Sequence, residues 1–240
     1  MKIASVFLDL DDTILDFRWA EERSLREALR AVGVELTQEM HRRYRAINCR
    51  QWELLEEGAL SREEVLTSRF GILFREYGID ASPERVCDAY ERGLGVGHRF
   101  MPGAEALLQT LHGRYGLYLA SNGSAAVQAS RIESAGLAKW MDGIFISEEL
   151  GADKPSRRYF DLCFSRIQDL DPHRAIIVGD SLTSDIRGGL NAGIRTCWYD
   201  PWDRPTRPDI CPDHTIRDLA ELPALLESLF EKEDHICKRS

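Results

Sequence analysis

The chain has 240 residues, of which 43% are hydrophobic and 30% are charged, and its net charge is −9. This composition argues against a disordered chain and supplies enough apolar residues for one large core, or for one domain with a smaller second domain. The negative charge repels polyanions, so we expect no nucleic-acid polymer as the main partner.

Cysteine usage and the apolar runs bear on where the protein works. Its six cysteines are scattered without a Cys-x-x-Cys pair, as is typical of reduced thiols in a cytoplasm. The first apolar run ends in carboxylates, unlike a signal peptide, and no later run approaches the ~20 residues that span a bilayer. We therefore expect a cytoplasmic protein with no membrane partner, and leave open whether it is a monomer or a homodimer.

The first expected element is a strand from Ile3 to Asp9, and four similar apolar runs follow later in the chain. Near-continuous apolar runs joined by helical sequence are typical of a parallel sheet covered on both faces. The sequence therefore predicts an α/β fold with a Rossmann-like parallel-sheet core. The later runs are Leu117 to Ser121, Ile144 to Ser147, Ala175 to Asp180 and Ile194 to Tyr199.

The interval from Phe17 to Gly93 contains helical signals and no convincing strand. It therefore predicts an all-α cap domain, residues 17–94, inserted into a core made of residues 1–16 and 95–240. The expected helix starts are Thr37, Ser61 in an S-x-x-E capping box with Glu64, and Ser82 before Pro83, and the expected stops are Gly58 and Gly78. The return path carries Gly93, Gly95 and Gly97, which fit a hinge and an ordinary turn equally well.

Polar side chains follow three of the expected strands. Because ligands of open α/β sheets bind beyond the carboxyl ends of the strands, we expect these side chains to converge on one pocket. They are Asp9 with Asp11 and Asp12 after the first strand, Ser121, Asn122 and Gly123 after the second, Lys154 and Pro155 in a loop, and Asp180 with Asp185 after a later strand.

Gathered carboxylates repel one another at low dielectric unless a cation neutralises them. Hard oxygen ligands without a nearby His or Cys cluster favour Mg²⁺, which also keeps several waters. A lone Asp-x-Asp is usually a solvated turn or a helix cap. The ordered set of four polar segments argues against that interpretation here.

These segments resemble the four ordered motifs of the haloacid dehalogenase-like hydrolase superfamily. The resemblance covers nearly the whole chain, including a helical cap between the first and second motifs, as in the C1-capped phosphatases of subfamily I. The matching stretches are DLDDT (9–13), SNG (121–123), KP (154–155) and GDSLTSD (179–185).

The resemblance implies that Asp9 is the nucleophile that attacks phosphorus, and that Asp11 protonates the leaving group and then activates water. It also implies Mg²⁺ as the cofactor, held by Asp9, the carbonyl of Asp11 and Asp180, with Asp185 acting through water or by orienting Lys154. The implied substrate-binding groups are Ser121, Lys154, Asn122, Gly123 and Thr13, although Thr13 could instead fix the loop. Asp12 receives no role beyond capping the following turn.

Two sequence features indicate which of the reactions known in this family to expect. Dehalogenases lack a carboxylate two residues after the nucleophile, so Asp11 favours phosphate chemistry. A phosphonatase would use a cap lysine for a Schiff base, and residues 17–93 contain no lysine. A phosphomonoesterase is therefore expected.

The cap sequence indicates a substrate class. Tyr44 to Phe70, with residues 146–155 and 184–200, resembles the pyrimidine 5′-nucleotidase branch of the family. Tyr44, Asn48 and Trp52 share one helix face and could stack a base and bind its edge. Packing against a neighbouring cap helix explains Tyr44 and Trp52 equally well. Asn48 is the stronger candidate, since a buried amide needs partners.

The sequence thus predicts a Mg²⁺-dependent phosphomonoester hydrolase that works through an aspartyl phosphate on a small phosphorylated metabolite, a nucleoside monophosphate. The alternatives within the superfamily are a sugar-phosphate phosphatase and a phosphosugar mutase. A non-enzymatic alternative is a phospho-aspartate binding switch, but such receiver domains are about half this length and lack a helical cap.

Overall fold

The computed structural model describes the backbone of residues 3–234 and the side chains of residues 3–229. Its centre is a parallel sheet of six strands in the order β3-β2-β1-β4-β5-β6. The expected α/β fold with a Rossmann-like core is thereby confirmed. The strands are β1 Ser5–Leu8, β2 Gly116–Ser121, β3 Gly143–Ile146, β4 Ala175–Gly179, β5 Arg195–Tyr199 and β6 His214–Ile216.

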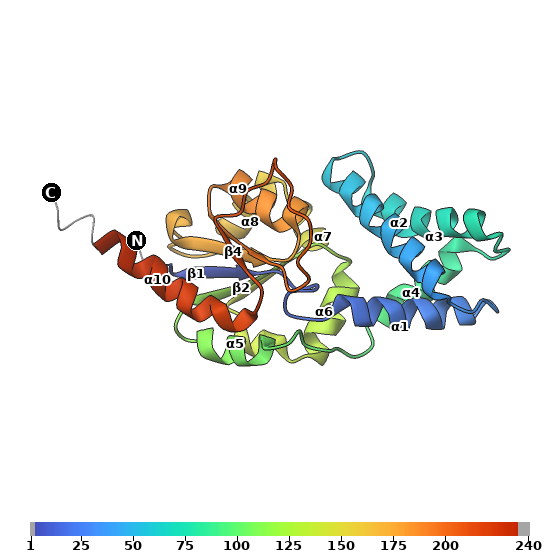
Figure 1. The fold of residues 1–240 in the computed structure, drawn as a ribbon, viewed down its shortest axis with the longest axis horizontal. Coiled ribbons are helices and arrows are strands. Elements are labelled where there is room, and N and C mark those ends of the chain that lie inside the picture. Colours follow the sequence, from blue (N-terminus) through green and yellow to red (C-terminus); the bar gives the residue numbers. More distant parts are fainter. Residues whose placement is uncertain (1–2, 235–240) are drawn as a thin grey trace.

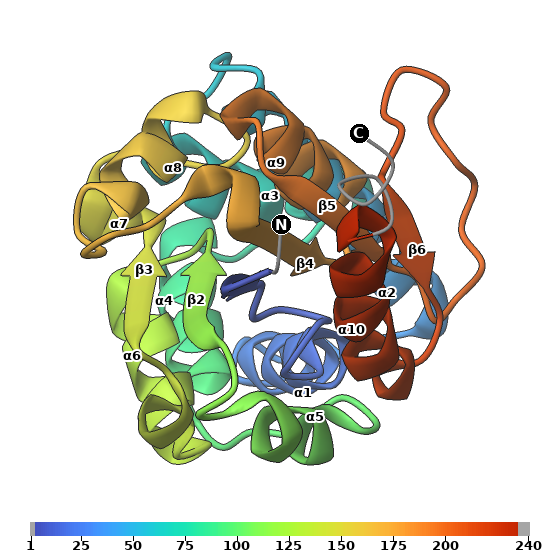
Figure 2. The same cartoon turned by 90° about the vertical axis from the view of Figure 1, so that its left-hand side faces the viewer.

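Both faces of the sheet are covered by helices, as Figure 2 shows. Val6 and Leu8 point into the cluster that contains α5 and α10, whereas Phe7 between them packs with α8 and α9 on the other face. This alternation explains why Val6, Phe7 and Leu8 are apolar in succession. The helices of the core are α5 Ala104–Leu111, α6 Ala125–Ser134, α7 Ser147–Leu150, α8 Arg157–Phe164, α9 Arg187–Ala192 and α10 Leu222–Asp234, with a π-helical turn, η3, at Leu182–Ile186.

Four helices between Phe17 and Leu94 form a separate bundle at the end of the molecule away from α10 (Figure 1). Its expected helix signals are confirmed, because Thr37 and Ser61 accept hydrogen bonds at the starts of α2 and α3, and Gly78 ends α3 in the left-handed conformation. These helices are α1 Phe17–Arg30, α2 Gln38–Glu56, α3 Arg62–Tyr77 and α4 Pro83–Leu94.

The two chain segments that join this bundle to the core run side by side. The amide of Asp16 donates to the carbonyl of Arg99 at 2.8 Å, and the amide of Met101 donates to Ile14 at 2.9 Å. Gly93 lies within α4, where a Cβ would come within 3.0 Å of Ser24 on α1. That glycine therefore allows close helix packing.

The strand order reverses between β1 and β4. Open α/β sheets bind ligands at such a point, beyond the carboxyl ends of the strands. Asp9 follows β1 and Asp180 follows β4, so both lie at this position. Among residues 3–234, no helix is long and apolar enough to cross a membrane.

Candidate active site

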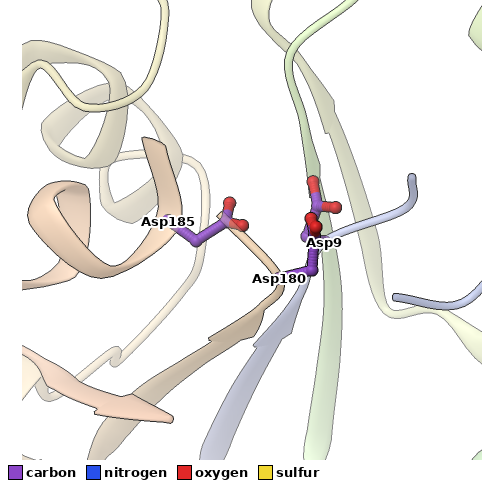
Figure 3. Close-up of side chains that lie close together, drawn as sticks. All are labelled: Asp9, Asp180 and Asp185. Atoms are coloured by element: carbon purple, nitrogen blue, oxygen red, sulfur yellow. The ribbon is translucent and has the colours of Figure 1, made fainter. Parts of the chain in front are cut away.

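Three carboxylates meet at the carboxyl edge of the sheet, as Figure 3 shows. Asp9, Asp180 and Asp185 each offer an oxygen, and these oxygens lie within 4.8 Å of one another. Asp9 and Asp180 follow adjacent strands, and Asp185 comes from the turn η3. Residues far apart in the sequence are thus brought together as the sequence predicts.

Lys154 lies beneath this cluster and is 1% exposed. Its Nζ donates to Asp9 Oδ1 at 2.7 Å, to Asp185 Oδ1 at 2.6 Å and to the carbonyl of Ala120 at 2.7 Å. Burial alone would lower the pKa of Lys154, but the charges of Asp185 and Asp9 outweigh it and raise the pKa. The ammonium group therefore stays charged.

The carboxylates are short of positive charge. Burial raises the pKa of Asp9 well above its usual value; the charge of Lys154 opposes the rise, and repulsion by neighbouring acids adds to it. Burial followed by repulsion from Asp12 and Asp185 raises the pKa of Asp180 to about 7, although Arg204 opposes the rise. Close oxygen donors with uncompensated charge fit a hard divalent cation such as Mg²⁺. Asp9, Asp180 and Asp185 are the residues that could hold it.

The position of Asp185 depends on the absence of a side chain at Gly179. Its Oδ2 accepts from the amide of Ser181 at 3.0 Å, which holds the carboxylate against the end of β4. A Cβ on Gly179 would lie 2.2 Å from that same oxygen. Only glycine therefore allows this arrangement.

Asp11 is held by two buried side chains of α6 that the sequence analysis did not single out. Gln128 Nε2 donates to Asp11 Oδ2 and to Ser121 Oγ, both at 2.8 Å, and Arg131 binds the other oxygen of Asp11. Gly123 leaves room for this contact, because a Cβ there would lie 2.8 Å from Gln128 Nε2. The candidate acid/base is thus fixed from a neighbouring helix.

Asn122 contacts the loop that carries Lys154. Its Nδ2 donates to the carbonyl of Lys154 and its Oδ1 accepts from the amide of Lys154, both at 2.9 Å. The amide of Gly123 donates to Ser147 Oγ at 3.3 Å. In this structure Asn122 therefore orients the lysine loop, and the Gly123 amide is bound within the protein.

Asp12 and Thr13 follow the catalytic candidates in the sequence but do not line the cavity between the cap and the core. Asp12 accepts from the backbone amide of Arg18 at 3.1 Å and from its Nε at 3.3 Å, in the first turn of α1, while the N-cap of that helix is Asp16. Thr13 is fully buried, and its hydroxyl has no hydrogen-bond partner among the described residues. Neither Thr13 nor Ser121 lines the cavity described next.

A cavity of about 190 Å³ separates the cap from the sheet edge. Among the sequence-predicted residues it is lined by Asp9, Asp11, Asn122, Gly123, Lys154, Asp180 and Asp185 from the core and by Asn48 and Trp52 from the cap. Tyr44 does not line it, because its ring packs against Phe70 and Tyr90 at centroid distances of 5.3 and 5.7 Å. The cap also supplies Phe17, Glu56, Arg69 and Glu91, which the sequence analysis did not identify.

The cap touches the core on both sides of the cavity. Arg62 Nη2 donates to Ser147 Oγ at 2.6 Å and forms an ion pair with Asp153, next to Lys154. Ser124 Oγ donates to Glu91 Oε2 at 3.1 Å, beside Gly123. These contacts hold the cap closed over the two loops that flank the carboxylates.

Comparison with known proteins places the chain among hydrolases. Residues 3–193 match the haloacid dehalogenase-like hydrolase family. The chain is 39% identical to the HAD-hydrolase YfnB of Bacillus subtilis over 222 residues, which cover 92% of this chain and 94% of that protein. It is 33% identical to the pyrimidine 5′-nucleotidase PynA of Streptococcus pneumoniae, with 95% and 97% of the two chains covered.

The crystal structure of YfnB bound to magnesium, described as revealing interdomain movement, superimposes with a TM-score of 0.90. The two sequences are 38% identical, and the match covers 94% of this chain and 99% of that one, so it includes the core and the cap. The resemblance expected from the four motifs is confirmed: this chain belongs to the haloacid dehalogenase-like hydrolase family.

Proposed function

We propose that this protein, a phosphoric monoester hydrolase, uses Mg²⁺ and an aspartyl phosphate on Asp9 to hydrolyse pyrimidine nucleoside monophosphates. The observation that carries the proposal is the convergence of Asp9, Asp180, Asp185 and Lys154 beneath a cavity that Asp11 also lines. The similarity to a pyrimidine 5′-nucleotidase over nearly the whole chain supports this substrate class.

In the first step, a carboxylate oxygen of Asp9 forms a bond to phosphorus while the ester P–O bond breaks. Asp11 donates a proton to the departing alkoxide, which leaves as an alcohol. Lys154 balances the charge on Asp9 and Asp185 and holds the nucleophile in place. Gln128 positions the acid. Bound Mg²⁺ would stabilise the negative charge on the phosphoryl oxygens.

In the second step, Asp11 takes a proton from a water molecule as that water attacks phosphorus. The acyl-phosphate bond breaks, inorganic phosphate leaves and the Asp9 carboxylate is restored. The same residue acts first as acid and then as base, so Asp11 needs a fixed position through both steps. Its bonds to Gln128 and Arg131 supply that position.

A phosphate-release screen tests the proposal. UMP, CMP, TMP, several sugar phosphates and phenyl phosphate are assayed with Mg²⁺ and with EDTA. Asp9→Asn is the blank, and Asp161→Asn, a change at an exposed position of α8, is the control. We expect release from UMP that requires Mg²⁺ and Asp9 and survives Asp161→Asn. Release that persists in Asp9→Asn or in EDTA contradicts the mechanism. A need for a bisphosphate activator would indicate a mutase.

A further inference from the structure

Arg69 on α3 is a charged residue of the cap with 1% exposure, and it lines the cavity. Its guanidinium group lies 4.9 Å from the ring centre of Tyr90 and 5.4 Å from that of Phe70. Burying a charge is costly unless the group is paired and hydrogen-bonded. The burial of this cation therefore needs an explanation beyond packing in the cap core.

The hydrogen bonds of Arg69 leave part of the group unused. Nε donates to the carbonyl of Leu66 at 3.1 Å, one Nη to Asn48 Oδ1 at 2.9 Å and the other to Glu91 Oε1 at 2.6 Å. A guanidinium group carries five N–H donors, so one N–H on each Nη remains after these bonds, and the Cys87 sulfur beside the group can accept from one of them. A molecule in the cavity can accept from the other.

Arg69 also fixes the orientation of the Asn48 amide. Because arginine only donates, the amide oxygen of Asn48 must face it, and Nδ2 then faces Glu21 Oε2 at 3.4 Å. The second N–H of Asn48 Nδ2 is then the hydrogen-bond donor that remains for a ligand. Asn48 and Arg69, which we call the donor pair, therefore present donors to the cavity and no acceptor.

The donor pair lies at the end of the cavity away from the carboxylate cluster. Asn48, Trp52 and Glu56 follow one another at spacings of four on α2, and Asp185 and Lys154 act electrostatically on Glu56. At ~1.5 Å per residue, Asn48 lies about 12 Å further along the helix axis than Glu56. Figure 1 shows the carboxyl end of α2 leaning toward the core. The donor pair therefore faces the part of a substrate remote from its phosphate.

Acids surround the donor pair and balance its charge. Glu91 Oε1 contacts Arg69, and Glu21 Oε2 contacts Asn48. The groups that face Glu21 in turn are His41 at 3.4 Å and Arg45 at 3.5 Å. A carboxylate or second phosphate at this end would meet Glu91 and Glu21. A neutral group with acceptor atoms is not repelled by these two carboxylates and can accept from the unused N–H donors.

We propose that the donor pair selects substrates whose end remote from the phosphate is uncharged and carries acceptor atoms, as the carbonyl oxygens of a pyrimidine base do. The inference rests on the proposed function and specifies what its substrates must offer. Sites that hydrogen-bond a substrate discriminate strongly, because an unsuitable substrate leaves their buried polar groups unpaired. Phosphate esters that carry a carboxylate at this end are disfavoured.

The first test compares UMP with phenyl phosphate, which has no base and no carbonyl oxygen to accept from the donor pair. In Arg69→Lys and in Asn48→Asp, we expect the ratio of kcat/KM for UMP to that for phenyl phosphate to fall about tenfold or more. Arg43→Lys, which alters an exposed cap arginine paired with Glu76, serves as the control and keeps the ratio. An unchanged ratio in variants that unfold at the wild-type temperature overturns the proposal.

The second test needs no variant. Wild-type enzyme is assayed with 5-carboxyuridine monophosphate and with the neutral, similarly sized 5-carboxamidouridine monophosphate. We expect kcat/KM for the carboxylate analogue to be lower than that for the carboxamide analogue by about tenfold or more. Equal values overturn the proposal. Failure of the proposed function looks different, because the wild-type enzyme would then hydrolyse phenyl phosphate but no nucleoside monophosphate.

Discussion

The carboxyl edge of the sheet and the cap present their residues to the cavity in different ways. At the sheet edge, Asp9 and Asp180 each follow a buried strand, so the backbone of the sheet sets their positions. In the cap, Asn48 and Arg69 lie on different helices, and only the packing of α2 on α3 brings them together. Catalytic position thus follows from topology, whereas the recognition surface follows from helix packing.

The two regions are joined by few side chains. Lys154 makes its contacts within the core, and Arg69 makes its contacts within the cap. Glu91 and Arg62 are cap residues that bond to the core. Changes at the sheet edge should therefore lower the rate for every substrate, and changes in the cap should alter the relative rates.

Replacement of Lys154 should have the largest effect. Lys154→Met leaves Asp9 and Asp185 without their ammonium partner, so we expect activity to fall about 10³-fold on every substrate. Removing one partner of a buried ion pair costs about 3–5 kcal/mol, so the metal-free variant should unfold at lower denaturant concentration and recover in part with Mg²⁺. Lys139→Met, at an exposed lysine beside Trp140, is the control. Loss of activity on nucleotides alone would contradict the separation of the two regions.

Two glycines, one in each region, provide a matched pair. Gly179→Ala places a Cβ 2.2 Å from Asp185 Oδ2, so the carboxylate must move. We expect activity to fall about 100-fold on all substrates and stability to fall by about 1–3 kcal/mol. Gly71→Ala lies in α3 with no atom within 4 Å of the new Cβ. It should raise stability by about 0.5–1 kcal/mol, because alanine favours helix.

Phosphate release and denaturant unfolding measure both glycine variants. Equal effects of Gly179→Ala and Gly71→Ala would show that the contact with Asp185 does not matter. An unchanged affinity for Mg²⁺ in Gly179→Ala, measured by calorimetry, would remove Asp185 from the metal site.

Most of the fold follows from local sequence. The five longer strands are near-continuous apolar runs, and the cap helices carry the start and stop residues that capping chemistry requires. The sequence analysis missed β6, His214–Ile216, because a strand of three residues gives too short a pattern to stand out. Its place at the sheet edge depends on pairing with β5, which is a tertiary contact.

The candidate site likewise contains residues that local sequence could locate and residues that it could not. Asp9, Asp180 and Asp185 could be located because polar residues after apolar strands are conspicuous, and Lys154 because it lies in the Lys-Pro pair of a loop between them in the sequence. Gln128, Arg131, Arg69 and Glu91 gave no such signal, since polar residues on helices usually face solvent. Helical spacing placed Tyr44, Asn48 and Trp52 on one face, but it did not show how deep each one lies. Packing of α3 and α4 buries Tyr44 and leaves the other two at the cavity.

Replacement of Trp52 should give a moderate and selective effect. Stacking of a base on an aromatic ring is worth about 1–3 kcal/mol, so we expect Trp52→Ala to raise KM for UMP about tenfold. KM for phenyl phosphate should change less. Tyr44→Phe, in the same stripe but packed inside the cap, should keep the ratio of the two KM values. Equal increases for both substrates in Trp52→Ala would remove its role in recognition.

Glu56 lies where the two regions meet, and its replacement should give the smallest effect. Burial raises the pKa of Glu56 from 4.5 to about 7; the charge of Asp185 adds to the rise, and a hydrogen bond with Thr183 and the charge of Lys154 oppose it. The raised pKa means that the folded state prefers the protonated acid, so the associated stability is present below pH 4.5 and is lost as the pH rises through 7. EDTA removes bound cations, which would otherwise mask this effect on stability.

In metal-free protein, Glu56→Gln should therefore raise the free energy of unfolding by about 1 kcal/mol at pH 8 and have little effect at pH 5. Both values come from denaturant unfolding of the two proteins in EDTA. The difference depends on the closed cap, because an open cap would return the carboxylate to water and to its ordinary pKa. Equal stabilisation at both pH values would mean that Glu56 does not approach Asp185 in the metal-free enzyme, and that the cap and the sheet edge come together only when ligands bind.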